Sequence, residues 1–319
     1  MVSPYVVGMT IETRVDPETG GWRLIAPDRA LRPDDSKRDP AAAPVCPFCP
    51  GNEHLTPPER MRVPEGAADW QVRVVPNKFP AVSADAGDHE VVIESPRHDW
   101  DLKEAGEDEV RTVLHALRDR ARALGADRAA VVAFRNYGKA AGASLSHPHS
   151  QIVALHEAPP GLTDRWRRAR DHHAATGRRL IDDTAGQERQ AGDRIVAEEK
   201  GLLVYQPYAA AVPHQTLFVP DDGRATLATA TDDALAALAA VLPGVLAALA
   251  RAAGDPAYNL FFHAGPADDP DAGQWFQWHA DLFPRVTTLG GLELATNLAV
   301  NPTSPELTAP VMRAASPWG

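Results

Sequence analysis

The sequence predicts an α+β fold built from two similar halves, each with an antiparallel sheet and one long helix. The order of elements supports this prediction, because in both halves strand-like runs are followed by a helix-like run and then by further strand-like runs. In both halves a late strand also carries a histidine and, two residues later, a histidine or an aspartate, at 147–149 and at 279–281. A chance repetition of the element order within one α+β domain is the alternative.

The first half has strand-like runs at 70–82, 89–96 and 129–136. Residues 107–125 are expected to form a helix, because their apolar side chains recur every three or four positions. A further strand is expected from His147 onward, where apolar and β-branched residues follow.

The second half repeats this order, with strand-like runs at 201–212, 214–220, 257–263 and 278–286 and a leucine-rich helix at 229–253. Between the halves, charged residues predict a polar helix from Thr163 to about His173 and then a connector. We therefore expect an N-terminal half at 1–165 and a C-terminal half at 166–319.

The composition argues against several classes of protein. The 319 residues carry a net charge of −11, whereas a nucleic-acid-binding surface is usually basic. Pro243 and Gly244 interrupt the apolar run 234–250, so we expect a core helix there and no membrane segment. The N-terminal residues lack a signal-peptide pattern, and two cysteines cannot form a disulfide framework, so the cytoplasm is the expected compartment.

Cys46 and Cys49 have the C-x-x-C spacing with which a tight turn can bind zinc. A structural zinc requires four ligands and the chain has no other cysteine, so two histidines would have to complete the set. His98 and His147 are candidates, because each lies next to the end of an expected strand. A redox pair and two buried free thiols are the alternatives.

The sequence SHPHSQI places His147, His149 and Gln151 on one face of an ideal strand. A solvated polar face is the alternative. Upstream, Arg29 and Arg32 are spaced to clamp a phosphate, although two solvated arginines would look the same.

Two loops have the chemistry expected of a nucleotide site. Asn77 and Phe79 combine an amide with an aromatic ring, which suits hydrogen bonding and stacking with a nucleobase. Asn136 precedes a loop of small residues that contains Ser144, and the backbone N–H groups of such a loop can approach a phosphate.

Taken in order, six segments resemble the galactose-1-phosphate uridylyltransferase family, a branch of the histidine-triad superfamily whose subunit is a tandem duplication. They are DRALRP, CPFCPGN, VPNKFPA, SPRHDWDL, RNYGKAAGASLSHPHSQ and GGLELATNLAVNP. The resemblance covers about residues 10–305, and its most specific part is His-Pro-His-x-Gln with the upstream Asn and Ser. It implies a histidine-triad-like unit in each half and a homodimer.

The resemblance also implies roles for single residues. His149 is the implied nucleophile, which attacks the α-phosphorus of a nucleotide sugar and forms a covalent nucleotidyl-histidine, and Gln151 holds a phosphoryl oxygen. The implied phosphate ligands are Ser144, Arg29 and Arg32. The implied nucleotide ligands are Asn77, Phe79 and Asn136. The implied zinc ligands are Cys46, Cys49, His98 and His147.

A second metal, iron or zinc, is implied in the C-terminal half. His263 and His279 match two of its histidines, and Asp281 stands where other members have a third. Glu157 and Asp164 are candidates for the fourth ligand. A cluster held only by hydrogen bonds is an equal alternative.

The first expectation for function is exchange of a nucleoside monophosphate between UDP-glucose and galactose 1-phosphate by a ping-pong mechanism. Glu293 matches the residue that accepts a sugar hydroxyl, but the small residues at 287–291 differ from the hexose-specific pattern. The segment GGLELAT resembles the ADP-glucose phosphorylase branch, so discharge of the same intermediate by phosphate or water is the alternative. A non-catalytic nucleotide-sugar sensor is a third hypothesis, which the intact His149 and Gln151 disfavour.

Overall fold

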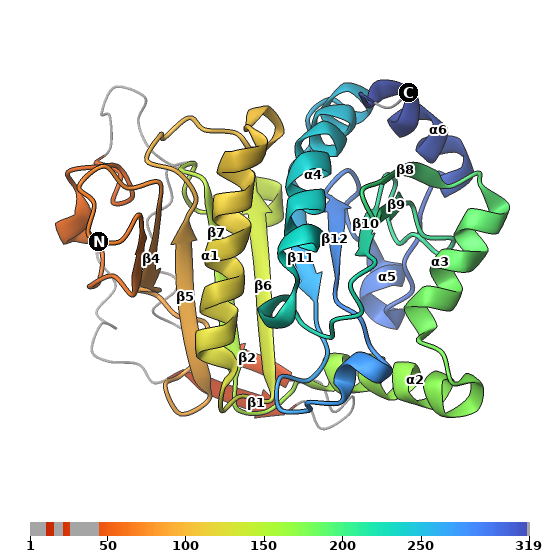
Figure 1. Cartoon of the computed structure of the whole chain (residues 1–319), viewed down its shortest axis with the longest axis horizontal. Helices are drawn as coiled ribbons and strands as arrows, with labels where there is room; N and C mark the ends of the chain where they lie inside the picture. The colour runs from red at the N-terminus through yellow and green to blue at the C-terminus, as the bar shows by residue number, and fades with distance from the viewer. Residues whose placement is uncertain (1–10, 16–21, 26–44, 318–319) are drawn as a thin grey trace.

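A computed structural model describes residues 11–15, 22–25 and 45–317 of the chain. Its main feature is a ten-stranded antiparallel sheet with the strand order β3-β4-β5-β7-β6-β11-β12-β10-β9-β8 (Figure 1). The strands are β3 (Met61–Val63), β4 (Val72–Pro76), β5 (Gly87–Ile93), β6 (Ala130–Tyr137), β7 (His149–Leu155), β8 (Ile195–Glu199), β9 (Leu202–Tyr205), β10 (Thr216–Pro220), β11 (Tyr258–His263) and β12 (His279–Pro284). A separate antiparallel pair consists of β1 (Glu12–Val15) and β2 (Trp22–Ile25).

The strand order follows the same pattern when it is traced inward from either edge of the sheet. The strands β3, β4, β5, β7 and β6 lie on one side, and their counterparts β8, β9, β10, β12 and β11 follow in reverse order on the other. The two sets meet where β6 pairs with β11, in antiparallel register from Tyr258↔Tyr137 to Phe262↔Ala133. The predicted α+β class and the repeated element order are therefore confirmed. The tandem duplication stays a prediction, as does the boundary at 165 and 166, which lies within α2 (Pro160–Thr176).

One long helix per half covers the same face of the sheet (Figure 1). These helices are α1 (Glu107–Gly125) and α4 (Asp232–Ala253), and they share one buried apolar cluster with strands of both halves. The Thr231 side chain caps α4 by accepting a hydrogen bond from the Ala234 N–H, and Gly254, with φ of 75°, ends it. By length and composition α4 could span a membrane. However, 61% of its apolar 18-residue segment is buried inside the fold, as expected of a core helix.

The connector between the halves is more helical than the sequence predicts. The expected polar helix extends to Thr176, where Gly177 ends α2 with φ of 72°. The expected connector then contains α3 (Leu180–Ala191), so that part of the prediction is wrong. The reason is that only a few apolar residues of α3 are in contact with the core, which leaves no clear apolar stripe in the sequence.

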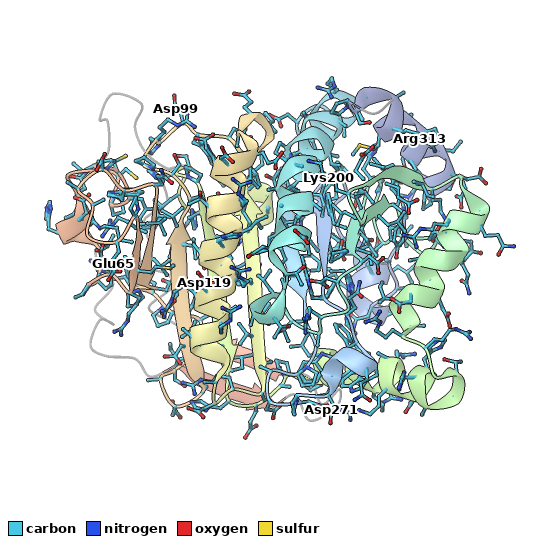
Figure 2. The ribbon with its side chains drawn as sticks, in the orientation of Figure 1. Glu65, Asp99, Asp119, Lys200, Asp271 and Arg313 are labelled. Carbon is cyan, nitrogen blue, oxygen red and sulfur yellow. The ribbon has the colours of Figure 1, made fainter. Side chains whose placement is uncertain are left out.

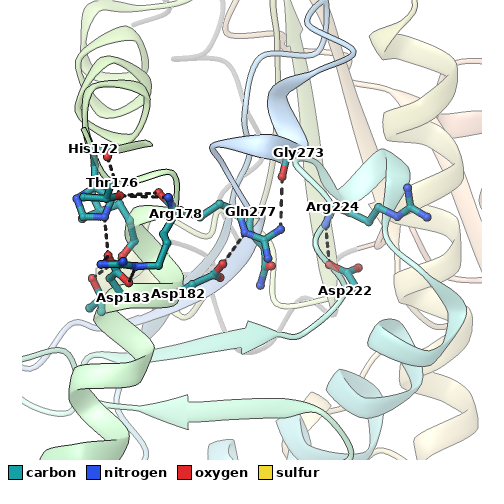
Figure 3. A network of polar contacts seen from close by, with 12 residues as sticks. His172, Thr176, Arg178, Asp182, Asp183, Asp222, Arg224, Gly273 and Gln277 are labelled. Carbon is teal, nitrogen blue, oxygen red and sulfur yellow. Dashed lines mark hydrogen bonds and ion pairs between the residues drawn. The ribbon is translucent and has the colours of Figure 1, made fainter. Parts of the chain in front are cut away.

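Ion pairs hold the junction between α2 and α3 (Figure 3). The Asp183 carboxylate accepts hydrogen bonds from His172, at 2.7 Å, and from Arg178, at 2.6 Å. Arg179 pairs with Asp182 and also donates to the Gly273 carbonyl, which links α3 to the loop before β12. This part of the fold therefore depends more on polar contacts than the two long helices do.

The remaining helices are short. They are α5 (Gly291–Thr296), α6 (Pro305–Ala315) and the 3-10 turns Glu53–Leu55, Leu102–Glu104, Lys139–Ala141, Leu227–Thr229 and Ala272–Gln274. Charged side chains such as Asp119 on α1 and Lys200 in the β8–β9 turn lie on the outside (Figure 2). The Lys200 ammonium lies 3.9 Å from the carboxylate of Glu107, so an ion pair at the surface also links the two halves.

Candidate active site and metal centre

His149 is the first residue of β7 and is only 9% exposed. Its Nδ1 lies 2.8 Å from the backbone carbonyl oxygen of His147. A carbonyl oxygen can only accept, so Nδ1 carries the proton and the lone pair of the neutral ring is on Nε2. This arrangement fixes the neutral tautomer, in which Nε2 rather than Nδ1 has the lone pair.

A cavity of about 260 Å³ opens beside His149. Its walls include five of the predicted site residues, namely Asn77, Phe79, Ser144, His149 and Gln151. Among the described residues that line it, Lys78 is the one cation and none is acidic. A cavity with this lining suits an anionic ligand with a flat, partly apolar group.

The carboxamide of Gln151 has a fixed orientation. Its Oε1 accepts a hydrogen bond from His89 Nε2, at 2.9 Å, and a longer one from Asn77 Nδ2, at 3.4 Å. The carboxamide nitrogen therefore points away from these two donors, and Gln151 also lines the cavity beside His149. The sequence reasoning missed His89, which lies on β5 two residues from Val91, the strand partner of Gln151.

Asn136 approaches His149 from β6. It lines a second cavity of about 530 Å³, whose walls also include His149 and Lys139. Its Oδ1 accepts a hydrogen bond of 2.8 Å from Asn259, its partner on β11. The structure thus places Asn136 and the cavity with Phe79 next to the same histidine.

A buried ion pair lies beneath the start of β7. The Glu94 carboxylate accepts hydrogen bonds from Arg135, at 2.9 Å, and from Ser150, at 2.5 Å. Arg135 also donates to the Tyr258 hydroxyl across the seam between β6 and β11. Ser150 is next to His149 in sequence, so this network helps to fix the backbone that positions the His149 ring.

The four predicted zinc ligands meet at one point. Ligand atoms of Cys46, Cys49, His98 and His147 all lie within 4.8 Å of one another. The Nδ1 of His147 is 3.6 Å from both sulfur atoms, and the Nδ1 of His98 is 3.4 Å from Cys49 Sγ. Tetrahedral zinc with ordinary Zn–S and Zn–N bonds separates sulfur and nitrogen by roughly 3.5 Å, so this donor set fits the ion.

The outer nitrogens of both histidines are held as well. His147 Nε2 donates to the Ser95 carbonyl at 2.8 Å, and His98 Nε2 lies 3.0 Å from the Ser146 hydroxyl. Burial lowers the pKa of His147 to about 4, so its ring is neutral at pH 7, as a metal ligand must be. Burial raises the pKa of the Cys46 thiol to about 11, so metal binding there must displace a proton.

The predicted second metal ligands also lie together, but hydrogen bonds already connect them. His263 Nε2 is 3.2 Å from an Asp281 oxygen, and the rings of His263 and His279 have centroids 4.7 Å apart. Gln215 Nε2 donates to both oxygens of Asp281, at 3.1 and 3.0 Å. Burial raises the pKa of Asp281 to about 6, and the bond from Gln215 acts against this shift.

Neither candidate for the fourth ligand completes a metal site at this cluster in the described part of the chain. Glu157 is exposed, and Asp164 is exposed and pairs with Arg167. Within the described residues, the cluster of Cys46, Cys49, His98 and His147 is the one group whose ligand atoms are close enough to share a metal ion. Of the two alternatives for this cluster, a second metal or hydrogen bonds alone, these contacts favour hydrogen bonds alone.

Of the three remaining predicted substrate ligands, the structure describes one, Glu293. Glu293 lies on α5, where its carboxylate accepts the Gly290 N–H, and it is not among the residues that line either cavity beside His149. Arg29 and Arg32 lie outside the described residues. The roles of all three stay predictions.

Comparison with known proteins agrees with this geometry. Residues 71–159, which run from β4 past the end of β7, match the model of the N-terminal domain of galactose-1-phosphate uridyl transferase. The chain is also 30% identical to an ADP-glucose phosphorylase of Arabidopsis thaliana, over 96% of this chain and 93% of that protein. The chain belongs to the galactose-1-phosphate uridylyltransferase family.

Other members of the family differ in how much of their length is matched. A galactose-1-phosphate uridylyltransferase of Streptomyces lividans is 31% identical over 66% of this chain and 56% of its own length. The crystal structure of the Arabidopsis thaliana phosphorylase with bound ADP-glucose superposes with a TM-score of 0.78 over 96% of this chain and 98% of that one. A uridylyltransferase structure reaches 0.79 at 28% identity, over 95% and 97%. The chain is thus a nucleotidyl-transfer enzyme of this family, on the ADP-glucose phosphorylase-like branch.

Proposed function

We propose that this enzyme takes a nucleoside monophosphate from a nucleotide sugar onto His149 and then passes it to a phosphate acceptor. The observation that supports this most directly is the hydrogen bond between His149 Nδ1 and the His147 carbonyl, which puts the lone pair on Nε2. In the first step Nε2 forms a bond to the α-phosphorus, and the bond from that phosphorus to the bridging oxygen breaks. The sugar 1-phosphate leaves with this oxygen and both electrons.

The surrounding groups stabilise this step. Positive charge develops on the imidazole ring, and the Nδ1–H···O=C bond to His147 stabilises it. The Gln151 carboxamide nitrogen, held by the bonds to Oε1, donates to a phosphoryl oxygen. Asn77 and Phe79 hold the base, and Lys78 adds positive charge to the wall of the cavity.

Inorganic phosphate is the acceptor that we favour, with ADP-glucose as the donor. A phosphate oxygen attacks the α-phosphorus, the N–P bond breaks, and ADP is released with His149 regenerated. The similarity to the Arabidopsis thaliana ADP-glucose phosphorylase extends through both halves of the chain, whereas the Streptomyces lividans uridylyltransferase is matched over 56% of its length. Uridylyl transfer from UDP-glucose to galactose 1-phosphate is the second candidate.

The metal centre has a supporting role in this proposal. Zinc held by Cys46, Cys49, His98 and His147 would anchor the loop before β7. His147 then connects the two sites, because its ring faces the cysteines while its carbonyl holds His149. We also propose that the enzyme is a cytoplasmic homodimer and that it acts on small molecules rather than on nucleic acid or membranes. Analytical ultracentrifugation measures its oligomeric state.

Intact-protein mass spectrometry tests the transfer. The enzyme is incubated with ADP-glucose or UDP-glucose without an acceptor, and a mass increment of AMP or UMP identifies the nucleotide on His149. His149→Ala is the control that should gain no mass. Phosphate or galactose 1-phosphate is then added to the labelled enzyme, and the one that removes the label is the acceptor. Absence of labelling with every nucleotide sugar, in a protein with its metal centre filled, would favour a sensor over an enzyme.

A further inference from the structure

His89 stands between a backbone N–H and the side chain of Gln151. The Ala81 N–H lies 3.0 Å from His89 Nδ1, and His89 Nε2 lies 2.9 Å from Gln151 Oε1. A backbone N–H can only donate, so Nδ1 accepts and the proton of the neutral ring is on Nε2. That proton then requires an acceptor, which is the carbonyl end of the Gln151 carboxamide.

Asn77 reinforces the same orientation. Its own Oδ1 accepts the Phe79 N–H at 2.9 Å, so its nitrogen faces Gln151 Oε1. The nitrogens of Asn77 and His89 lie 3.1 Å apart because both converge on this one acceptor. If the Gln151 carboxamide were reversed, three N–H donors would face one another in a buried place.

The C-terminal half of the protein contains an equivalent series of hydrogen bonds, which different side chains make. The Ala211 N–H donates to Gln215 Oε1 at 2.8 Å, and Gln215 Nε2 donates to Asp281. Gln215 lies two residues before Leu217, the strand partner of Asp281, as His89 lies two residues before Val91, the strand partner of Gln151. A glutamine can therefore do at this position what His89 does in the first half.

We propose that His89 is a positioning residue for nucleotidyl transfer, which acts by holding the Gln151 carboxamide with its nitrogen toward the phosphoryl group on His149. This proposal rests on the proposed function, because it names the transferred group. It adds a residue outside the His-Pro-His-x-Gln segment and states through which atom that residue acts. His89 is 6% exposed, and its Nε2 faces the site by way of the Gln151 carboxamide oxygen.

Four variants test the proposal by the single-turnover rate at which the nucleotide sugar labels His149. His89→Leu removes both hydrogen bonds and should slow labelling by about 10- to 100-fold, the effect expected from losing one bond to a charged phosphoryl group. His89→Gln copies the arrangement of Gln215 and should recover most of the rate. Gln151→Ala should be about as slow as His89→Leu, and the double variant should be no slower than Gln151→Ala. If the two effects multiply instead, or if His89→Gln is as slow as His89→Leu, His89 does not act through Gln151.

A second measurement does not depend on turnover. Nitrogen-15 NMR of the histidine rings reports which nitrogen carries the proton, and His89 should be the Nε2–H tautomer in the wild type. A proton on Nδ1 would overturn the proposal. If no nucleotide sugar labels His149, the proposed function fails, and this measurement still decides whether His89 holds Gln151 as described.

Discussion

His149 and His279 hold their rings in the same way, one in each half of the chain. The Nδ1 of each lies next to the backbone carbonyl oxygen two residues earlier, at 2.8 Å from His147 and at 3.1 Å from Gln277. The residue two positions later differs, because it is Gln151 in the first half and Asp281 in the second. An amide can donate to a phosphoryl oxygen, whereas a carboxylate repels it, so we expect transfer in the first half only.

Separate roles for His147 and His149 give the first prediction. His149→Ala should lower the rate of transfer by about 10⁴- to 10⁶-fold, as removal of a nucleophile does, while keeping the metal and the melting temperature. His147→Ala should instead lower metal content and melting temperature, with activity lost as a consequence. Turnover, metal analysis and thermal unfolding of both variants separate the roles. Near-wild-type transfer by His149→Ala would show that the covalent mechanism is wrong.

The metal centre gives the second prediction. Purified protein should contain about one zinc per chain, and Cys46→Ser should lose it together with part of the folding free energy, because binding energy at a structural site is folding energy. Elemental analysis and thermal unfolding with and without a chelator measure both effects. A native protein without metal, in which both thiols react freely, would contradict this expectation.

The third prediction concerns the cluster in the second half. Asp281 already accepts two hydrogen bonds from Gln215 and lies next to His263, so we expect no second metal. His263→Ala should leave metal content unchanged, whereas the matched variant His98→Ala should lower it. A content of two metals per chain that falls to one in His263→Ala would support the metal interpretation of the cluster instead.

The buried pair of Arg135 and Glu94 gives the fourth prediction. Arg135→Met leaves the Glu94 carboxylate buried without its cation, which typically costs about 3–5 kcal/mol in the free energy of unfolding. The exposed pair of Arg97 and Glu109 provides the control, since Arg97→Ala should cost no more than about 1 kcal/mol. Urea denaturation measures the free energy of unfolding of both variants. Equal effects would mean that burial of the first pair has no energetic consequence.

The sequence was informative where side chains repeat or cluster along the chain. The helix expected at 107–125 has the same bounds as α1, and the C-x-x-C and His-Pro-His segments meet in space as expected. The roles of Gln215 and His89 were not visible, because each depends on a strand register that brings together residues more than 60 positions apart. The helix α3 was missed because polar contacts, rather than an apolar stripe, hold much of it.

The pairing of β6 with β11 has a consequence for fragments of this protein. A cut between residues 165 and 166 would leave β6 in one fragment and β11 in the other. Each strand would then be an edge strand with unpaired backbone N–H and C=O groups. An exposed edge of this kind accepts another strand readily, and a second copy of the same fragment offers one in the same antiparallel direction. Each half is therefore self-complementary, so truncated products should associate with themselves rather than remain monomeric.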